Sequence, residues 1–204
     1  SSGKSTLISR ISNSKPKIAD YPFTTLIPNL GVVDLKSFGG SSGESFVVVD
    51  IPGLIEGASE GKGLGHEFLK HIDRTGFLIH LLDGSADNIL ENYTIINKEL
   101  KLHSKELAKK EQMLVINKID LIDEELIEFL KKEIKKANPK LKGKIFAISG
   151  VTGQGIKELV FEIWKKIQKN RRDRLLTCLP DKANDEKQED FKIYKPESSD
   201  KYAF

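Results

Sequence analysis

The sequence predicts an α/β fold in which helices cover both faces of a doubly wound, mostly parallel sheet. Two observations support this fold class. Short apolar runs rich in β-branched residues alternate with longer segments in which apolar residues recur at helical spacing. Motifs of polar residues and glycine directly follow three of these runs, and the carboxyl ends of strands are where open parallel sheets bind ligands.

The apolar runs give the expected strands, and the periodic segments give the expected helices. Strands are expected at residues 46–50, 77–83, 112–117 and 144–149. Helices are expected at residues 4–12, 63–74, 88–105, 123–138 and 154–170, and Trp164 belongs to the apolar stripe of the last one. Residues 37–45 are rich in glycine and serine and are expected to form a hairpin turn, because no helix follows them.

Composition and charge exclude several classes of protein. Of the 204 residues, 33 are Lys or Arg and 30 are Asp or Glu, and a net charge of +3 is too small to indicate nucleic-acid binding by itself. The single cysteine, Cys178, excludes an internal disulfide and a cysteine-cluster metal site, and it is typical of a reducing compartment. Since no run approaches the ~18 apolar residues of a membrane span, we expect a soluble protein. We expect it in the cytoplasm, with an organelle as the alternative for a eukaryotic source.

Gly3-Lys4-Ser5 matches the second half of the phosphate-binding motif G-x-x-x-x-G-K-[ST]. In that motif the loop amides face phosphate, the lysine neutralises phosphate oxygens and the hydroxyl binds Mg²⁺. The chain begins inside this motif, without a starting methionine or a preceding strand, so we expect a fragment. A tripeptide alone is also compatible with an ordinary helix start.

Asp50-Ile51-Pro52-Gly53 stands at the carboxyl end of an expected strand. In nucleotide switches such an aspartate holds a metal-bound water, and the glycine amide senses the γ-phosphate. An Asp-x-Pro-Gly turn without ligand is the alternative. Thr24-Thr25 lies in an irregular stretch, where a switch loop with a Mg²⁺ ligand is expected, although the pair also suits a strand.

Asn117-Lys118-Ile119-Asp120 lies at the end of the expected strand at residues 112–117 and indicates which base is bound. The carboxylate of Asp120 can accept hydrogen bonds from N1 and N2 of guanine, whereas adenine has neither donor there. We expect the stem of Lys118 to cover the base and Asn117 to tie neighbouring loops together. Ser149-Gly150-Val151 closes another expected strand, where backbone amides could reach the guanine O6.

Two longer strings resemble the Obg family of translation-associated small GTPases. Residues 18–33 are similar to switch I of that family, and residues 50–58 together with 61–75 are similar to its switch II. Developmentally regulated GTP-binding proteins share residues 55–58 but are less similar elsewhere in these strings. The resemblance covers residues 1–171 and implies a P-loop GTPase fold that lacks its first strand, with a short C-terminal extension.

The resemblance implies a binding site for GTP or GDP with Mg²⁺, held by Ser5 and Thr25, and assigns no side chain a catalytic role. Phosphate contacts then fall to Ser1, Ser2, Gly3, Lys4 and Ser5. Sensing of the γ-phosphate falls to Phe23, Thr24, Thr25, Leu26 and Ile27 and to Asp50, Ile51, Pro52 and Gly53. Base contacts fall to Asn117, Lys118, Ile119, Asp120, Ser149, Gly150 and Val151.

Several positions depart from the family pattern. Ser1 stands where relatives usually carry an asparagine that holds K⁺, so K⁺ stimulation is not implied. Gly150 replaces the usual alanine, which keeps the backbone donor. Leu54 stands where many signalling GTPases carry a glutamine that orients water, and because leucine has no polar group we expect slow hydrolysis.

The expected domains are an N-terminally truncated G domain at residues 1–172, a linker at 173–190 and the start of a truncated C-terminal domain at 191–204. The predicted function is that of a monomeric, slowly hydrolysing GTP switch, and resemblance alone implies a partner in the large ribosomal subunit or its RNA. Two other classes remain open: a metabolic P-loop kinase, which the 117–120 motif disfavours, and a nucleotide-independent ribosome- or RNA-binding module.

Overall fold

The computed structural model describes residues 2–12, 17–18, 29–50, 75–103, 108–139, 141 and 143–177. Its strands are β1 (Lys17–Ile18), β2 (Asn29–Asp34), β3 (Ser45–Val49), β4 (Leu78–Asp83), β5 (Gln112–Asn117) and β6 (Phe146–Ala147). Its helices are α1 (Lys4–Ile11), α3 (Ile89–His103), α5 (Glu124–Ala137) and α6 (Ile156–Thr177), with short 3₁₀ turns η1 (Leu35–Phe38) and η3 (Ile119–Leu121).

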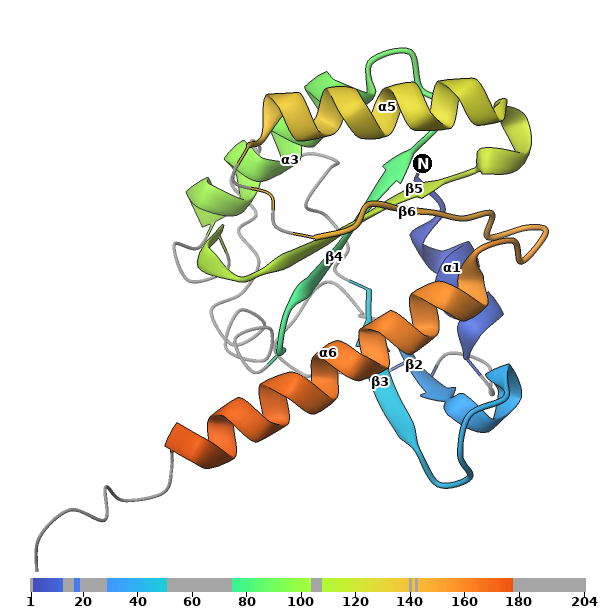
Figure 1. Ribbon diagram of the computed structural model, residues 1–204, viewed down its shortest axis with the longest axis vertical. Coiled ribbons are helices and arrows are strands. Elements are labelled where there is room, and N and C mark those ends of the chain that lie inside the picture. Colours follow the sequence, from blue (N-terminus) through green and yellow to red (C-terminus); the bar gives the residue numbers. More distant parts are fainter. Residues whose placement is uncertain are drawn as a thin grey trace, which may run out of the picture.

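The strands β4, β5 and β6 form a parallel sheet that lies between two layers of helices. Figure 1 shows α3 and α5 on one side of this sheet and α6 and α1 on the other. The register places Asp83 directly opposite Asn117, so β4 and β5 end at the same level. Consequently the polar residues that follow these two strands lie side by side at the carboxyl edge of the sheet.

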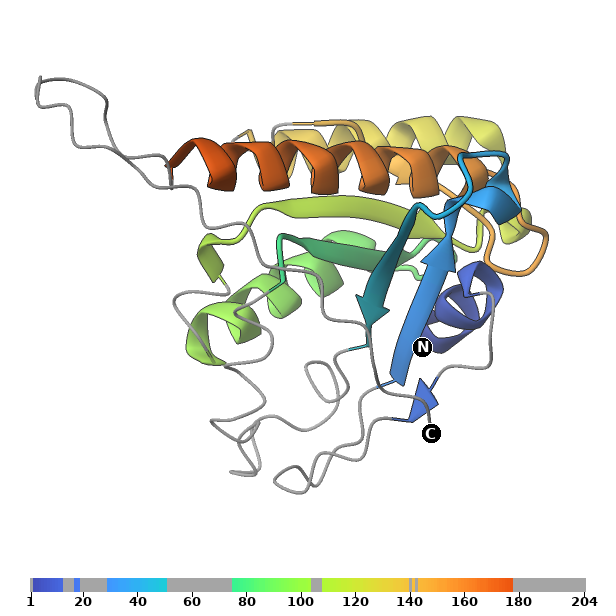
Figure 2. The same ribbon diagram turned by 90° about the horizontal axis from the view of Figure 1, so that it is seen from below.

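The strands β1, β2 and β3 form a second, antiparallel sheet. β2 pairs with β3 from Leu30 opposite Val49 to Asp34 opposite Ser45, and η1 with its glycine-rich turn joins them. The carboxylate of Asp34 accepts a hydrogen bond from the Lys36 amide and caps η1. Figure 2 shows this hairpin beside the parallel sheet, under the same long helix α6.

Two apolar clusters hold the layers together. On the α6 side, Val33, Phe46 and Leu81 are buried with side chains of α1 and α6, and the Phe46 and Trp164 rings stack at 6.4 Å between their centroids. On the other side, Leu114 and Ile116 are buried with side chains of α3 and α5. Because side chains of one strand alternate between the faces of the sheet, the continuous apolar run of β5 contributes side chains to both clusters.

The predicted α/β class with a parallel sheet is confirmed, and the largest differences in element bounds are at β6 and at the end of α6. β6 is shorter than the expected strand at 144–149, and α6 continues to Thr177, so the first five residues of the expected linker are helical. The domain division itself stays a prediction. The expected helix at 63–74 and the expected C-terminal domain lie outside the described residues.

The sequence predicts a single sheet, whereas the described strands form two three-stranded sheets. The division lies between β3 and β4, whose facing edges border a cavity of about 590 Å³. Within the described part of the chain, β3 is hydrogen-bonded to β2 along one edge and β4 to β5 along one edge. In addition, no helix among the described residues has the length and apolar character needed to cross a membrane.

Candidate functional site

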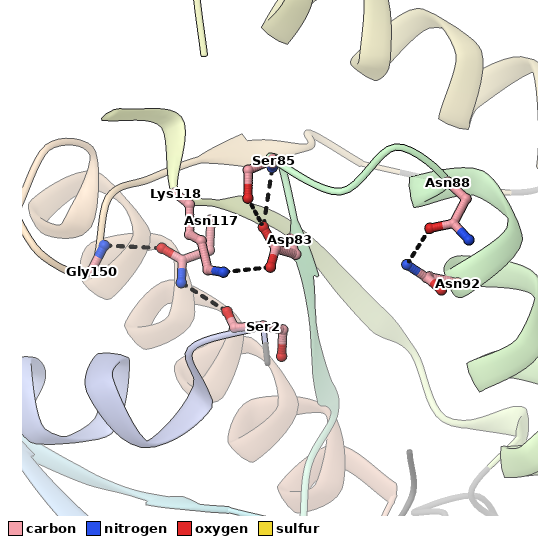
Figure 3. A network of polar contacts seen from close by, with 8 residues as sticks. All are labelled: Ser2, Asp83, Ser85, Asn88, Asn92, Asn117, Lys118 and Gly150. Atoms are coloured by element: carbon pink, nitrogen blue, oxygen red, sulfur yellow. Dashed lines mark hydrogen bonds and ion pairs between the residues drawn. The ribbon is translucent and has the colours of Figure 1, made fainter. Parts of the chain in front are cut away.

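Polar residues from several distant segments meet at the carboxyl edge of the parallel sheet. The loop before α1 supplies Ser2, β4 ends in Asp83, β5 ends in Asn117 and continues into Lys118, and Gly150 follows β6. Figure 3 shows these residues converging on this edge from distant segments of the chain. Open parallel sheets bind their ligands at this edge, so the topology alone marks it as the candidate site.

Asn117 connects the other segments. Its side chain is buried; its Nδ2 donates to the Ser2 carbonyl oxygen at 2.9 Å, and its Oδ1 accepts from the Gly150 amide at 2.9 Å (Figure 3). One amide group therefore fixes the chain before α1 to the loop after β6, across separations of 115 and 33 residues. The prediction that Asn117 ties neighbouring loops together is confirmed.

Lys118 has a left-handed backbone, with φ of 66° and ψ of 35°, and is the one described non-glycine residue with positive φ. This conformation is costly for a residue with a Cβ, and it occurs mostly where the surroundings impose it. Its Nζ donates to Oδ2 of Asp83 at 2.5 Å. The ion pair aims the side chain along the site edge toward β4, instead of leaving it free in solvent.

Asp83 is a site residue that sequence reasoning missed. Its Oδ1 accepts hydrogen bonds from the Ser85 amide at 3.1 Å and from the Ser85 hydroxyl at 2.6 Å. Partial burial alone would raise the pKa of Asp83, but hydrogen bonds from Lys118 and Ser85 outweigh it and hold the pKa below its usual value. In the sequence, the one signal for this role was that Asp83 ends an expected strand and is followed by Gly84.

Gly84 brings β4 and β5 together at this edge. Its amide donates to the Asn117 carbonyl oxygen at 2.8 Å. A Cβ built at position 84 would lie 2.9 Å from that same oxygen and 2.9 Å from Cγ2 of Ile116, which is closer than such atoms approach in proteins. Any larger residue would therefore push apart the strands that carry Asp83 and Lys118.

Asp120 lies in η3, on the side of the site that faces solvent. Its side chain is exposed, while the neighbouring Ile119 is buried and its amide donates to the Ile148 carbonyl oxygen at 3.2 Å. The backbone of the turn is thus anchored to the strand end at β6. The carboxylate is left able to accept hydrogen bonds from a ligand.

The loop after β6 forms a compact turn. Ser149 is fully buried, and its Oγ accepts from the Thr152 amide at 3.0 Å. The Gly150 amide is directed at Asn117, as described above, and Val151 is 69% exposed. A Cβ built on Gly150 would meet Asn117 Oδ1 at 3.5 Å, an ordinary contact, so the loop has room for an alanine here.

The start of α1 forms the other end of the site. Gly3 is the N-cap at φ of 82°, and no side chain of the described residues caps the helix. The first-turn amides carry partial positive charge, which favours an anion at this end. A Cβ on Gly3 would lie 2.7 Å from Nδ2 of Asn117. Both the backbone angle and this close approach require glycine at position 3.

Asp50 and Ser5 place oxygen atoms beside this helix start. Asp50 is buried, and its Oδ2 accepts from the Ser5 hydroxyl at 3.4 Å. Its Oδ1 is buried and has no hydrogen-bond partner among the described residues. A buried carboxylate oxygen without a partner is costly unless a ligand satisfies it. Carboxylate and hydroxyl oxygens are hard ligands, so the pair fits a small divalent cation such as Mg²⁺.

The structure therefore brings together one part of the predicted site, comprising Ser2, Gly3, Lys4 and Ser5, then Asp50, and then Asn117, Lys118, Ile119, Asp120, Ser149, Gly150 and Val151. The remaining predicted residues lie outside the described part of the chain: Ser1, the stretch 23–27 with Thr25, and residues 51–53. Their roles stay predictions.

Comparison with known proteins shows to which family the chain belongs. A family model described as "50S ribosome-binding GTPase" matches residues 1–118, which is more than half of the chain. The chain belongs to this family of GTPases. The resemblance to the Obg family is confirmed as well, because the curated relatives at 47–50% identity are named GTPase Obg.

Two of these relatives illustrate the match. The GTPase Obg of Fervidobacterium nodosum is 50% identical over 173 residues, covering 83% of this chain and 38% of that protein. The GTPase Obg of Microcystis aeruginosa is 49% identical over 170 residues, covering 83% of this chain and 47% of that protein. The chain thus spans less than half of the length of these curated relatives.

Solved structures of GTPases share the fold. A crystal structure of an Era variant from Aquifex aeolicus, bound to GDP·AlF4⁻, superposes with a TM-score of 0.57 at 28% identity, over 81% of this chain and 53% of that one. The G domain of the T. maritima FeoB iron transporter gives 0.53 at 21% identity, over 83% and 92%. The latter likeness shows the fold alone, and it agrees with the predicted P-loop GTPase architecture.

Proposed function

We propose that this chain is the guanine-nucleotide-binding part of a Mg²⁺-dependent GTPase. The observation that carries the proposal is the arrangement at the end of β5, where Asn117 is locked to both neighbouring loops and Lys118 is held by Asp83. The exposed carboxylate of Asp120 follows directly, and it would accept hydrogen bonds from N1 and N2 of guanine. The proposed base specificity rests on Asp120.

The phosphate side of the same site supports a nucleotide that carries Mg²⁺. The uncapped amides of α1 and the side chain of Lys4 would bind phosphate oxygens. Ser5 would ligate the cation together with Thr25, and Asp50 would hold a metal-bound water through its unpartnered oxygen. When bound, Mg²⁺ neutralises charge on the β- and γ-phosphates. The segments 23–27 and 50–53 would sense the γ-phosphate.

Binding of guanine nucleotides is tested by calorimetry of the chain with GDP, GTP, ATP and XTP, in parallel with a version extended at its N-terminus to the full phosphate-loop spacing. We expect GDP and GTP to bind and ATP to bind at least 100-fold more weakly. Asp120→Asn should shift the preference toward XTP, whose C2 carbonyl requires a donor.

Glu124→Gln provides the matched control, because it removes an equal charge from an exposed side chain in the next helix. This variant should leave the preference for guanine unchanged. Equal affinity for ATP and GTP in the unmodified chain, or an Asp120→Asn variant that still prefers GTP over XTP, contradicts the proposal.

We propose slow intrinsic hydrolysis of GTP, on the order of 10⁻⁴ to 10⁻³ s⁻¹, as in other unassisted GTPases. The reason is Leu54, which offers no polar group to orient the attacking water. Phosphate release from the extended version measures this rate. Leu54→Ala should change it less than threefold, and turnover at many per second would refute the proposed rate.

The proposed partner is the large ribosomal subunit, and the proposed setting is a monomer in the cytoplasm. The family description supports the partner. Co-sedimentation with large subunits should retain the chain more strongly with a non-hydrolysable GTP analogue than with GDP, because the γ-phosphate orders switch segments. Equal retention with GTP analogue, GDP and no nucleotide would refute a nucleotide-controlled ribosomal role.

A further inference from the structure

The two ends of the parallel sheet differ in charge. At the end where the strands begin, the segments before β5 and β6 and the later parts of α5 and α6 contain eleven Lys or Arg and three Asp or Glu, at residues 109–111, 132–136, 144 and 165–173. We call these segments the amino-edge surface. Because the whole chain has a net charge of +3, its positive charge is concentrated on this surface.

The opposite end of the sheet, which carries the candidate site, is acidic. Residues 83–91 and 118–125 contain seven Asp or Glu and one lysine, Lys118. A polyanion is therefore attracted to the amino edge and repelled by the acidic residues at the carboxyl edge. A partner bound at the amino edge leaves the nucleotide site uncovered.

The fold brings the amino-edge segments together. In Figure 1, α5 and α6 run back across the sheet and end on the side where β4 and β5 begin. Lys166 of α6 forms an ion pair with Glu111, which directly precedes β5. Nδ2 of Asn170 donates to the carbonyl oxygen of Gly76, just before β4, at 3.4 Å. The basic part of α6 is thus held against the starts of both strands.

Helix dipoles explain only part of this charge. Lys135 and Lys136 lie in the last turn of α5, where cations stabilise a helix. Lys165, Lys169 and Arg172 lie before the last turn of α6, and the dipole effect is confined to that turn. All three are exposed, and their spacing of i, i+4 and i+7 places them on one face of the helix.

This face of α6 does not stabilise the helix. Lys165 and Lys169 are like charges at i and i+4, an arrangement that destabilises helices. Lys165 pairs with Glu162 at 2.7 Å, whereas Lys169 and Arg172 have no acidic partner in the part of the chain that the structure describes. Exposed pairs such as that of Lys165 contribute little, so its ammonium group can exchange to a ligand. The array indicates an anionic partner.

A hollow beside this face gives a second, independent observation. It has a volume of about 270 Å³ and lies between α6 and the starts of β5 and β6. Lys165 and Lys169 line it from α6, and Lys144 lines it from the segment before β6. Two glutamates also line it, and each is paired with a lysine of α6. Ammonium groups on both sides of a hollow fit a linear polyanion.

We propose that the amino-edge surface binds the phosphodiester backbone of double-stranded RNA. Lys165, Lys169 and Arg172 contact phosphates along one strand, and Lys144 contacts that strand from the other side of the hollow. A helical rise of about 1.5 Å per residue separates the three α6 positions by about 6 and about 4.5 Å, so the array covers a run of neighbouring phosphates. The choice of RNA rests on the proposed ribosomal partner, whereas the choice of phosphates rests on the charges.

The composition of the surface disfavours other polyanions. Single-stranded nucleic acid binds through aromatic side chains on which its bases stack, and none of the four segments contains an aromatic residue. Helices that bind membranes insert exposed apolar residues, whereas the large exposed apolar side chains of the described residues lie outside these segments. A duplex presents its phosphates and covers its bases, so it fits the surface best.

The test measures binding of the whole chain to a labelled RNA hairpin of about 16 base pairs by fluorescence anisotropy, without nucleotide and at several salt concentrations. Four contacting side chains predict that the logarithm of Kd rises with the logarithm of the salt concentration with a slope of about 3 to 4. A single strand of the same length should bind at least fivefold more weakly. Vesicles that contain phosphatidylserine should not retain the chain at the same salt concentration.

Paired substitutions locate the contact. Lys165→Gln with Lys169→Gln should weaken binding of the hairpin at least tenfold and lower the salt slope by about 2. Lys36→Gln with Lys157→Gln is the matched control, because it removes the same charge from exposed side chains outside the amino-edge surface; it should change binding less than twofold. Circular dichroism checks the folding of both variants, and the salt slope of the unmodified chain remains a test if the first variant unfolds.

Equal binding by the two double variants, a single strand that binds as tightly as the hairpin, or retention by vesicles without binding of the hairpin would overturn the proposal. A chain that binds the hairpin but has no preference for guanine nucleotides would leave this inference standing and refute the proposed function. Absence of hairpin binding together with intact binding of GDP would do the reverse.

Discussion

Acid should destabilise this protein through His80 more than through any exposed histidine. His80 lies in β4 and is 6% exposed; its Nδ1 lies 3.2 Å from Oε1 of Gln112, and its ring centroid lies 5.2 Å from that of Tyr93. Burial lowers the pKa of His80 from 6.5 to about 4, and the hydrogen bond to Gln112 opposes this only in part. The imidazole is therefore neutral in the folded state at pH 7.

The sign and size of the effect follow from proton linkage. Below pH 6.5 the unfolded chain takes up a proton at His80 that the folded chain refuses until about pH 4, so lowering the pH favours unfolding. A difference of about two and a half pKa units corresponds to roughly 3 kcal/mol when the folded-state pKa is reached. About 2 kcal/mol of this loss is expected by pH 5.

The assay is urea unfolding between pH 7 and pH 4, followed through the fluorescence of Trp164, the single tryptophan. His80→Gln keeps a polar group opposite Gln112 but has no proton to bind, so the difference between the two proteins isolates His80 from all other titrating groups. The free energy of unfolding of the unmodified chain should fall more steeply, by about 3 kcal/mol over this range. Parallel curves for the two proteins would refute the reasoning.

Three further changes probe the candidate site. Asn117→Ala should lower the free energy of unfolding by about 2 kcal/mol, because the buried Gly150 amide loses its partner and the Ser2 contact is lost; an unchanged urea midpoint would contradict the bridging role. Gly3→Ala should cost more than 1 kcal/mol and Gly150→Ala less than about 0.5, since only the first combines positive φ with a 2.7 Å clash; equal losses would refute this. Asp83→Asn should destabilise the chain at pH 7 and lose this effect in strong acid, because the pKa of Asp83 is lowered in the folded state: the stabilisation is present above the usual carboxyl pKa and is lost as the pH falls through the folded-state pKa. A pH-independent difference would argue against the ion pair with Lys118.

Local patterns in the sequence predicted the elements well, because apolar periodicity and capping act over a few residues. α5 is an example. At its start, the carboxylate of Asp123 accepts a hydrogen bond from the Leu126 amide at 2.7 Å. In its last turn, the positive charges of Lys135 and Lys136 interact favourably with the helix dipole. The motif at 117–120 was likewise recognisable, because base recognition requires particular residue types at fixed spacing.

The pairing of strands could not be predicted to the same degree, since it depends on contacts between residues far apart in the sequence. Nothing near β3 or β4 indicates that their facing edges border a cavity. Asp83 was missed for the same reason: a single aspartate after a strand carries little information. It becomes a site residue only because the parallel register places it opposite Asn117 and within reach of Lys118.

The bridge made by Asn117 has a consequence for how the two ends of a nucleotide would be bound. A single planar side chain is hydrogen-bonded to Ser2 on the proposed phosphate side and to Gly150 on the proposed base side, so a shift of either loop would strain the other. Ligands of the two halves should then be coupled: pyrophosphate should tighten the binding of guanosine, and guanosine should tighten the binding of pyrophosphate by the same factor. In such a site the free energy of binding the intact nucleotide exceeds the sum contributed by its separated halves.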